Sequence, residues 1–533
     1  MKLFKSLFLT TVLASLLFSC GTSAILSTPI ANIDATPLKT ADLTEYEKQN
    51  WGHLDLIKDT IPGMSVEKAY AEIIQDKKGK KVIVAVVDSG IDIDHEDLND
   101  VVWTNKKEVP NNGKDDDKNG YIDDVHGWNF LGDGYDEQLE FVRIIVKGDK
   151  SNPQYEAAIA EYDTKYQQAL GNKTRYDQIY QVVKGADDAI TKHFNKKDYT
   201  KEDVAKINTE DENLKQSVMM LNNMYLNGFD SAGAALKRIK GTLDYYTDQL
   251  NINLNKDLKG RTTNDDPDNM STKYYGNGSV KPVKKSESHG THVAGIIAAE
   301  RNNGLGVNGV ANNVEIMSIR AVPNGDEYDK DVALAIRYAV DNGASIINGS
   351  FGKYYSPHSD WVRDAIAYAG KNDVLFINAA GNEGEDLDQV AVYPNDQVKN
   401  GPEVSDNFVT VGALEPKYGE NVVAGFSNYG KINVDVFAPG AKVYSTTPEN
   451  EYDTKGGTSM AAPAVAGVAA LIRSYYPKLT ASQVKQVLMD SGLAVKTNVI
   501  TGGDAKNVNP FGDLSKSGKM VNAYNALIMA SKL

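Results

Sequence analysis

The chain has 533 residues, of which 41% are hydrophobic and 24% charged, a composition typical of globular proteins. A single hydrophobic core stops growing near roughly 250 to 300 residues, so we expect more than one structural unit. The formal net charge of -15 argues against a nucleic-acid binder, because phosphate contacts require clustered Lys and Arg. Cys20 is the only cysteine, so stability must come from packing or metal ions and not from intrachain disulfides.

Residues 1–19 have the features of a secretory signal peptide. Lysines precede an apolar run over residues 7–18, which is too short for the roughly 20 residues that a bilayer span needs. The run leads into LFSC, which resembles a bacterial lipobox and predicts cleavage before Cys20 and lipidation of its thiol. The alternative is an ordinary signal peptide with an incidental cysteine. Under the lipid interpretation, residues 20–49 form a tether from the membrane to the folded domain.

The segment KKVIVAVVDSGID, residues 80–92, begins with a continuous β-branched apolar run. Such a run is typical of a strand buried on both faces, as in a parallel sheet that is covered by helices. Asp88 follows at the carboxyl end of this strand, where α/β sheets place ligand-binding and catalytic groups. The pattern alone is weak, because many α/β enzymes end a strand with Asp.

The acidic loop NNGKDDDKNGYIDD, residues 111–124, resembles an EF-hand calcium loop. His126 stands at the twelfth loop position in place of the usual Glu, so a site here has to recruit Asp124 or a more distant group. The alternative is a solvated acidic turn without a metal. The predicted ligands, at alternate positions of the loop, are Asp115, Asp117, Asn119, Tyr121 and Asp123.

The long segment 133–275 is predicted to be helical. In residues 155–170, apolar and Tyr side chains recur at spacings of three and four, as one face of a helix requires. The pattern continues in residues 211–226 and 233–250. We therefore expect a helical hairpin or a small helical bundle.

Two further stretches carry candidate catalytic residues. SHGTHVAGIIAA, residues 288–299, contains His289 and His292, a pair that suits either a metal site or a general base with a packing histidine. In GGTSMAAPAVAGVAALIRSYYP, residues 456–477, Ser459 lies at the start of a predicted buried helix. Backbone N–H groups at a helix start can stabilise a developing oxyanion, although a serine there is also an ordinary N-cap residue.

The candidate residues occur in the order Asp88, His289 and Ser459. Their contexts DSGID, HGTHVAG and GTSMAAP resemble the three active-site motifs of the subtilisin-like serine proteases, the subtilases. The resemblance implies that the serine is the nucleophile, the histidine the general base and acid, and the aspartate the residue that orients the imidazole. VLFINAAGNEG, residues 374–384, resembles the segment whose Asn, here Asn382, completes the oxyanion hole with the N–H of the serine. Taken alone, this segment is equally a turn between a strand and a helix.

The fold class implied by this resemblance is α/β: a subtilisin-like parallel sheet with helices on both faces, plus an α-helical insertion. The predicted catalytic domain comprises residues 50–132 and 276–533, and residues 133–275 form the insertion. We therefore expect an exported, membrane-anchored serine endopeptidase that cleaves protein or peptide substrates through an acyl-enzyme intermediate.

The resemblance also implies a substrate-binding site. Residues 343–352 and 378–381 resemble the two segments that line the S1 pocket of subtilases, and the first offers an edge to which an extended peptide can add. Phe351 and Val392 are expected to narrow the pocket, which favours apolar P1 side chains of moderate size. The predicted substrate-binding residues are Ser350, Phe351, Gly352, Ala379, Ala380, Gly381 and Val392.

A separate calcium site follows from the same resemblance. Asp97 and the loop NNGLGV, residues 302–307, resemble the high-affinity calcium site of subtilisin. There, Asn303 is expected to give a side-chain oxygen, and Leu305 and Val307 to give carbonyl oxygens. Calcium stabilises such a protein because the ion binds only the folded state, so we expect structural calcium and no catalytic metal.

Two other classes of protein compete with an active protease. A metallohydrolase would use His289 and His292, but no third His, Glu or Cys lies at metal-ligand spacing in the adjacent helix. An inactive protease-like binding protein would not need Asp88, Ser459 and Asn382 to be intact. For the insertion, one alternative is a purely structural addition that packs on the core. The other is a gate that overhangs the cleft and filters substrates.

Overall fold

The computed structural model describes residues 27–533. The predicted signal peptide, residues 1–19, and the predicted lipidation site, Cys20, lie outside the described residues. Across the described range, no helix is both long enough and apolar enough to cross a membrane.

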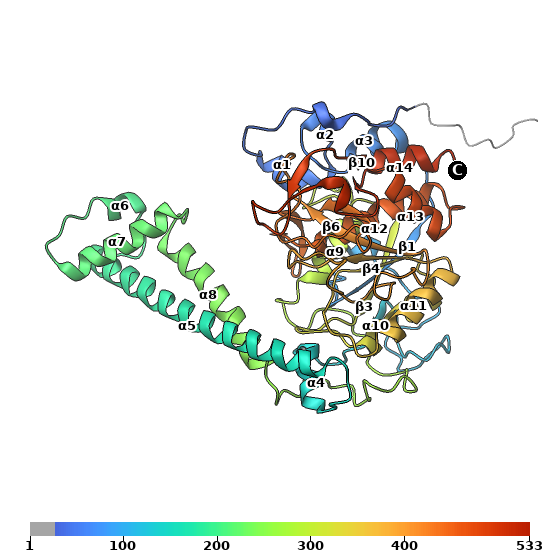
Figure 1. Ribbon diagram of the computed structural model, residues 1–533, viewed down its shortest axis with the longest axis horizontal. Coiled ribbons are helices and arrows are strands. Elements are labelled where there is room, and N and C mark those ends of the chain that lie inside the picture. Colours follow the sequence, from blue (N-terminus) through green and yellow to red (C-terminus); the bar gives the residue numbers. More distant parts are fainter. Residues whose placement is uncertain (1–26) are drawn as a thin grey trace, which may run out of the picture.

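A nine-stranded sheet forms the centre of the molecule, with the strand order β10-β13-β7-β6-β5-β4-β1-β3-β2 (Figure 1). Neighbouring strands are parallel, apart from the short edge pair β10 and β13. The strands are β1 (Val82–Asp88), β2 (Gly127–Asn129), β3 (Val314–Arg320), β4 (Ile346–Gly349), β5 (Leu375–Ala379), β6 (Phe408–Leu414), β7 (Val436–Pro439), β10 (Leu493–Ala494) and β13 (Lys519–Met520). Two antiparallel hairpins lie outside this sheet: β8 (Val443–Thr447) with β9 (Glu451–Lys455), and β11 (Asn498–Ile500) with β12 (Val508–Pro510).

Helices cover both faces of the sheet. Alternate residues of each strand point to opposite faces, so each strand contributes side chains to both helical layers. In β1, Val84 and Val86 belong to a cluster with residues of α9, α12, α13 and α14. Ala85 and Val87 belong to a second cluster with residues of α10 and α11. These helices are α9 (His289–Ala298), α10 (Asp329–Asp341), α11 (Ser359–Lys371), α12 (Thr458–Tyr475), α13 (Ala481–Asp490) and α14 (Ala523–Ala530). The predicted α/β class, with helices on both faces, is confirmed.

The helical insertion forms an arm, defined here as residues 140–253, which projects away from the body (Figure 1). Helices α5 and α8 pack together along the arm, and α6 and α7 lie at its far end. One apolar cluster lies at the base of the arm and another at its far end. The elements are α4 (Glu140–Lys147), α5 (Tyr155–Phe194), α6 (Lys201–Ala205), α7 (Glu212–Leu226), α8 (Ala232–Asp248) and the π-helical turn η5 (Gln249–Asn253).

Residues 30–50 pack against the body, which corrects the extent of the tether that composition predicts over residues 20–49. Ile33 is 2% exposed and lies in an apolar cluster, and Ile30 exchanges two hydrogen bonds with the side chain of Asn525 (2.7 and 3.0 Å). A few scattered apolar residues are buried here, although the overall composition of the segment is that of a linker. The short helices before β1 are η1 (Ile33–Ala35), α1 (Glu45–Asn50), η2 (Trp51–His53), α2 (Leu56–Asp59), α3 (Val66–Ala69) and η3 (Tyr70–Ile74).

Candidate active site

Asp88 and His289 form a hydrogen-bonded pair at the carboxyl end of β1. Asp88 is the last residue of that strand, and His289 is the first residue of α9. The imidazole Nδ1 lies 2.8 and 2.9 Å from the two carboxylate oxygens of Asp88. The helix can start so close to the strand because a Cβ on Gly290 would lie only 2.3 Å from the carbonyl oxygen of Gly90. An ionised carboxylate can only accept hydrogen bonds. In the neutral imidazole, Nδ1 therefore carries the proton and Nε2 is the hydrogen-bond acceptor.

The charge of Asp88 changes the acidity of His289. Burial alone would lower the pKa of the imidazole, but the charge of Asp88 and its hydrogen bond outweigh burial and raise the pKa above its ordinary value of 6.5. The histidine side chain is still 37% exposed, so it remains accessible to a reacting group. The pair therefore provides an imidazole that is a stronger base than a free histidine.

Ser459 lies in the first turn of α12, next to the segment that follows β4. Its hydroxyl donates a hydrogen bond to the carbonyl of Ser350 (3.1 Å), and the Ser350 hydroxyl donates to the carbonyl of Ser459 (2.9 Å). Across residues 27–533, the Ser459 hydroxyl has no hydrogen bond to His289. The hydroxyl must therefore leave the Ser350 carbonyl before it can pass its proton to an imidazole, and catalytic hydrogen bonds often tighten only when substrate is bound.

Asn382 reaches the start of the same helix. Its side-chain oxygen accepts from the backbone N–H (2.8 Å) and the hydroxyl (3.1 Å) of Thr458. The Thr458 hydroxyl in turn accepts from the N–H of Gly381 (3.0 Å). Thr458 is fully buried and joins the loop after β5 to α12. Thr458 is not among the residues predicted for the site, although it directly precedes Ser459 in the sequence.

A cavity of about 370 Å³ lies beside the end of β5, and its lining includes Ala379, Ala380 and Val392. Gly352 lies close to this cavity wall, since a Cβ on it would be 3.1 Å from Cγ1 of Val392. Gly381 and Ser350 are bonded to residues at the start of α12. The structure thus brings six of the seven predicted substrate-binding residues to the cavity or to the start of α12.

Phe351 is the exception, because it is not among the residues that line this cavity, and its role in narrowing the pocket stays a prediction. The side chain is 8% exposed and belongs to the apolar cluster packed with α10 and α11. Consecutive side chains of an extended segment point to opposite sides. Phe351 therefore faces the core, whereas Ser350 and Gly352 face α12 and Val392.

His292 does not share a site with His289. It is fully buried, and its Nε2 lies 3.1 Å from the carbonyl oxygen of Asp453. Burial lowers the pKa of this imidazole to about 3, so the ring is neutral at physiological pH. Because the two histidines have different partners, the pair does not favour a metallohydrolase.

Asp97 and residues of the loop 302–307 come together. The buried carboxylate of Asp97 accepts from the side-chain amide of Asn303 (2.7 Å) and from the N–H of Val307 (3.1 Å). The N–H of Leu305 donates to the side-chain oxygen of Asn303 (2.9 Å). Burial raises the pKa of Asp97. A buried carboxylate beside an amide in a tight loop fits the oxygen ligands that calcium takes.

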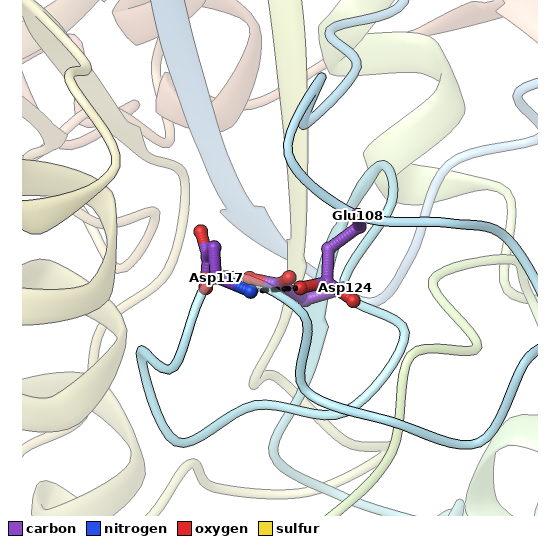
Figure 2. Close-up of side chains that lie close together, drawn as sticks. All are labelled: Glu108, Asp117 and Asp124. Atoms are coloured by element: carbon purple, nitrogen blue, oxygen red, sulfur yellow. Dashed lines mark hydrogen bonds between the residues drawn. The ribbon is translucent and has the colours of Figure 1, made fainter.

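In the acidic loop, two of the predicted calcium ligands accept hydrogen bonds from backbone N–H groups. The carboxylate of Asp123 accepts from the N–H groups of residues 112–113 (3.0 and 2.9 Å), and that of Asp115 accepts from those of residues 119–120 (3.1 and 2.9 Å). Within the described residues, Asp117 is the one predicted ligand that belongs to a close group of three carboxylates. Its partners in that group are Asp124, which the sequence names as a group that such a site has to recruit, and Glu108 from outside the loop (Figure 2).

The fold is an α/β sheet with helices on both faces, which carries the hydrogen-bonded Asp88–His289 pair at the end of β1 and Ser459 at the start of α12. The family model of the subtilase family matches residues 79–512. The chain therefore belongs to the subtilase family.

Similar proteins include a thermophilic serine proteinase of Bacillus sp. (strain AK1), which is 42% identical over 189 residues, 35% of this chain and 43% of that protein. Subtilisin DY of Bacillus licheniformis is 37% identical over 222 residues, 41% of this chain and 76% of that protein. Thermitase of Thermoactinomyces vulgaris is 36% identical over 221 residues, 41% of this chain and 70% of that protein. The chain spans less than half the length of the first of these relatives.

Proposed function

We propose that this protein is an active serine endopeptidase in which Ser459 is the nucleophile, His289 the general base, and Asp88 the residue that orients the imidazole. The observation that carries the proposal is the hydrogen bond between His289 Nδ1 and Asp88, which leaves Nε2 as the acceptor. The helices that carry the histidine and the serine, α9 and α12, pack against each other.

The reaction follows from these groups. The Ser459 hydroxyl leaves the Ser350 carbonyl, gives its proton to Nε2 of His289, and attacks the scissile carbonyl carbon. Asp88 stabilises the imidazolium that forms. The imidazolium then protonates the leaving amine as the C–N bond breaks, which leaves an acyl ester on Ser459. Water hydrolyses this ester in a second step, with His289 again acting as the base.

The oxyanion of each tetrahedral intermediate is stabilised at the start of α12. The side-chain oxygen of Asn382 is occupied by Thr458, so the NH₂ group of the amide is the part that can donate to the oxyanion. The first N–H groups of a helix have no partner within the helix, so the N–H of Ser459 is the second donor. Two donors in a fixed position stabilise charge without reorganisation.

Substrates bind as extended peptides along the segment that begins at Ser350. Lys353 in this segment is paired with Tyr393, a residue of the cavity lining, through two backbone hydrogen bonds of 2.9 Å. The P1 side chain enters the cavity, where Val392 limits its size and Ala379 and Ala380 at the end of β5 favour apolar groups. We propose a preference for apolar P1 residues of moderate size.

The helical arm filters substrates at this cleft. Its base is tied to the substrate-binding segment, because Glu140 forms a 2.7 Å ion pair with the buried Lys353 and Phe141 packs on Tyr355 (ring centroids 5.7 Å apart). Partial burial, and next the neighbouring Tyr246, raise the pKa of Tyr245 in α8, and the negative charge of Glu383 beside Asn382 makes a smaller contribution in the same direction. Large folded proteins would meet the arm before they reach the cleft, whereas short peptides would not.

The protein is exported and anchored by a lipid on Cys20. Residues 30–50 pack against the body and are not part of such a tether. A structural calcium ion is held by Asp97, Asn303 and the loop that contains Leu305 and Val307. The ion would stabilise the folded state, since it has no comparable site in the unfolded chain.

The experiment that tests the protease proposal is cleavage-site profiling of a proteome incubated with the wild type or with Ser459→Ala. We expect new peptide termini with apolar P1 residues for the wild type and none for the variant. Equal cleavage by both proteins would overturn the assignment of Ser459. A wild type that binds proteins but generates no new termini would support an inactive, protease-like binding protein instead.

A further inference from the structure

A second cavity, of about 700 Å³, lies between the short helices before β1 and the loops that follow β6 and β7. Its volume is within the roughly 300 to 1,000 Å³ that is typical of ligand sites. Residues of the segments 42–51, 415–425 and 500–505 line it, together with Lys442 and Thr454. We call this cavity the β6–β7 groove. The three segments are far apart in the sequence, so only the folded chain forms it.

The floor of the groove is apolar. Trp51 is 1% exposed and Val423 is 3% exposed, and both belong to one apolar cluster. The indole N–H of Trp51 already donates to the carbonyl of Lys442 (3.1 Å), so this polar atom needs no ligand. Leu43 and Ile500, which are partly buried, add apolar surface to the lining. A ligand that covers this floor gains most from apolar side chains.

Exposed lysines surround this floor. Lys442 pairs with Glu415 (2.9 Å), and Lys48 pairs with Glu45 (2.6 Å). Lys417 is also exposed and, across residues 27–533, has no carboxylate within the 4.0 Å of an ion pair. The lining contains three lysines and two acidic residues, in a chain whose net charge is -15. This local excess of positive charge favours a ligand with an anionic group near Lys417.

One wall of the groove lies against the loop that carries Asn382. Gly384 is two residues after Asn382, and a Cβ on it would lie 2.8 Å from Cα of Gly502. A Cβ on Gly425 would likewise lie 3.1 Å from Cα of Gly503. The backbones can approach so closely because glycine has no side chain. The wall that contains Gly425 and Gly503 is therefore continuous with the loop of the oxyanion hole.

Another part of the wall leads to the nucleophile. Thr454 lies in β9, and the chain runs from this strand through Gly457 to Ser459. A Cβ on Gly457 would lie 3.7 Å from Nδ2 of Asn382, the nitrogen that is free to donate to an oxyanion. The groove therefore begins beside the catalytic residues, although none of them is part of its lining.

The order of the strands places the groove on one side of Ser459 and the substrate-binding segment on the other. Strands β4, β5, β6 and β7 are neighbours and parallel, so their carboxyl ends lie along one edge of the sheet. The segment that begins at Ser350 follows β4, the loop of Asn382 follows β5, and the groove lies after β6 and β7. Helix α1, which contributes to the groove, and α4 at the base of the arm lie at opposite ends of the body (Figure 1). A peptide that runs along the Ser350 segment and passes Ser459 therefore continues into the groove.

We propose that the β6–β7 groove binds the part of the substrate on the C-terminal side of the scissile bond, with an apolar side chain on the floor and an acidic residue at Lys417. The residue attached to the scissile bond lies at the catalytic groups, so the groove holds residues further along the chain. This inference rests on the proposed protease function. It adds a second selection to the P1 preference. This selection acts before the acyl-enzyme forms, since the C-terminal part of the substrate leaves with the amine.

The proposal is tested with quenched fluorescent peptides that share all residues before the scissile bond and differ after it. One peptide ends two residues after the bond, and the other continues for six residues that include two leucines and one glutamate. We expect the wild type to cleave the longer peptide with a severalfold higher kcat/KM, because the added residues bind before the acyl-enzyme forms. Equal kcat/KM for the two peptides would overturn the proposal. Cleavage of neither peptide would overturn the proposed function instead.

Two variants of the groove sharpen this test. Lys417→Glu brings a negative charge to the glutamate of the longer peptide, and Ile500→Ser removes apolar surface, so each should lower the ratio of the two kcat/KM values. One matched control is Lys478→Glu, at an exposed lysine after the far end of α12. The other is Val508→Ser, at the exposed partner of Ile500 in the β11–β12 hairpin. A ratio that is unchanged in both groove variants, or that falls equally in the controls, would contradict the proposal.

Binding is measured separately in the full chain carrying Ser459→Ala, so that no cleavage interferes. The probe is a fluorescently labelled peptide that consists of the six residues after the bond alone, and fluorescence anisotropy gives its Kd. We expect a Kd that rises with salt and rises severalfold on Lys417→Glu, because the pairing at Lys417 is exposed to solvent. If the peptide does not bind, or if Lys417→Glu does not weaken its binding, the groove is not a substrate site, whether or not the protein is an active protease.

Discussion

The catalytic body and the helical arm are stabilised in different ways. Helix α12 has 18 residues, nearly all of which are buried against the sheet and its neighbouring helices. Helix α5 has 40 residues, and its buried residues are Ala158, Ala169, Val183, Ala186 and Ile190. A helix with so small a buried stripe is stabilised mainly by its partner in the hairpin and by its own helical propensity. The body therefore needs its core to form a site, whereas the arm is an attachment whose far end can change without disturbing that site.

The largest effect is expected inside the body, for Asp88→Asn. This change leaves the size of the side chain intact but favours the wrong tautomer of His289, so we expect kcat to fall by about 10⁴. In the wild type, kcat/KM should rise with pH through a pKa above 6.5, since the pKa of His289 is raised and only the neutral ring is a base.

The variant should also move the acid limb of the pH profile to lower pH, because burial without the Asp88 charge lowers the pKa of His289. The profile is measured with a chromogenic peptide across the acid and neutral range. A limb that stays in place would show that Asp88 does not control this histidine.

A smaller loss is expected for Asn382→Ala, which removes one oxyanion donor and should lower kcat by about 10² to 10³. KM should change little, since the donor acts on the transition state more than on the bound substrate. Steady-state kinetics with the same peptide test this. The matched change in the arm, Tyr245→Phe, should leave kcat for the peptide unaltered.

Core substitutions of similar size should separate the two regions by stability. Leu471→Ala in α12 empties space in the main core and should lower the free energy of unfolding by about 2–5 kcal/mol. Ile190→Ala in the far end of the arm should leave the main thermal transition in place and accelerate hydrogen exchange only over residues 176–239. If both variants lowered the main transition equally, body and arm would form one cooperative unit.

The smallest effect is expected for shortening the arm. Tyr176 stacks on Tyr246 (ring centroids 5.9 Å apart), so replacing residues 181–241 with a short glycine-rich turn keeps this pair and the apolar cluster at the base. We expect kcat/KM for a short peptide to stay the same and that for a large folded protein to rise severalfold. An unchanged ratio of the two in the folded variant would leave the arm without a filtering role.

The sequence was sufficient for features that depend on local pattern. The β-branched run before Asp88 and the small residues after Ser459 predict a buried strand and a buried helix, and the structure contains both. The orientation of Phe351 was not predictable from composition, since it depends on which side of an extended segment faces the core. Glu108 lies outside the EF-hand-like window, and only the folded turn of the chain brings it to Asp117.

The central claim is that Ser459 is an activated nucleophile. The most direct measurement is mass-spectrometric mapping of the protein after reaction with a fluorophosphonate, which modifies a serine only when a neighbouring base activates it. We predict stoichiometric labelling of Ser459 in the wild type, none in His289→Ala, and loss of peptidase activity in step with labelling. Labelling of another serine, or full activity in protein whose Ser459 is modified, would contradict the account.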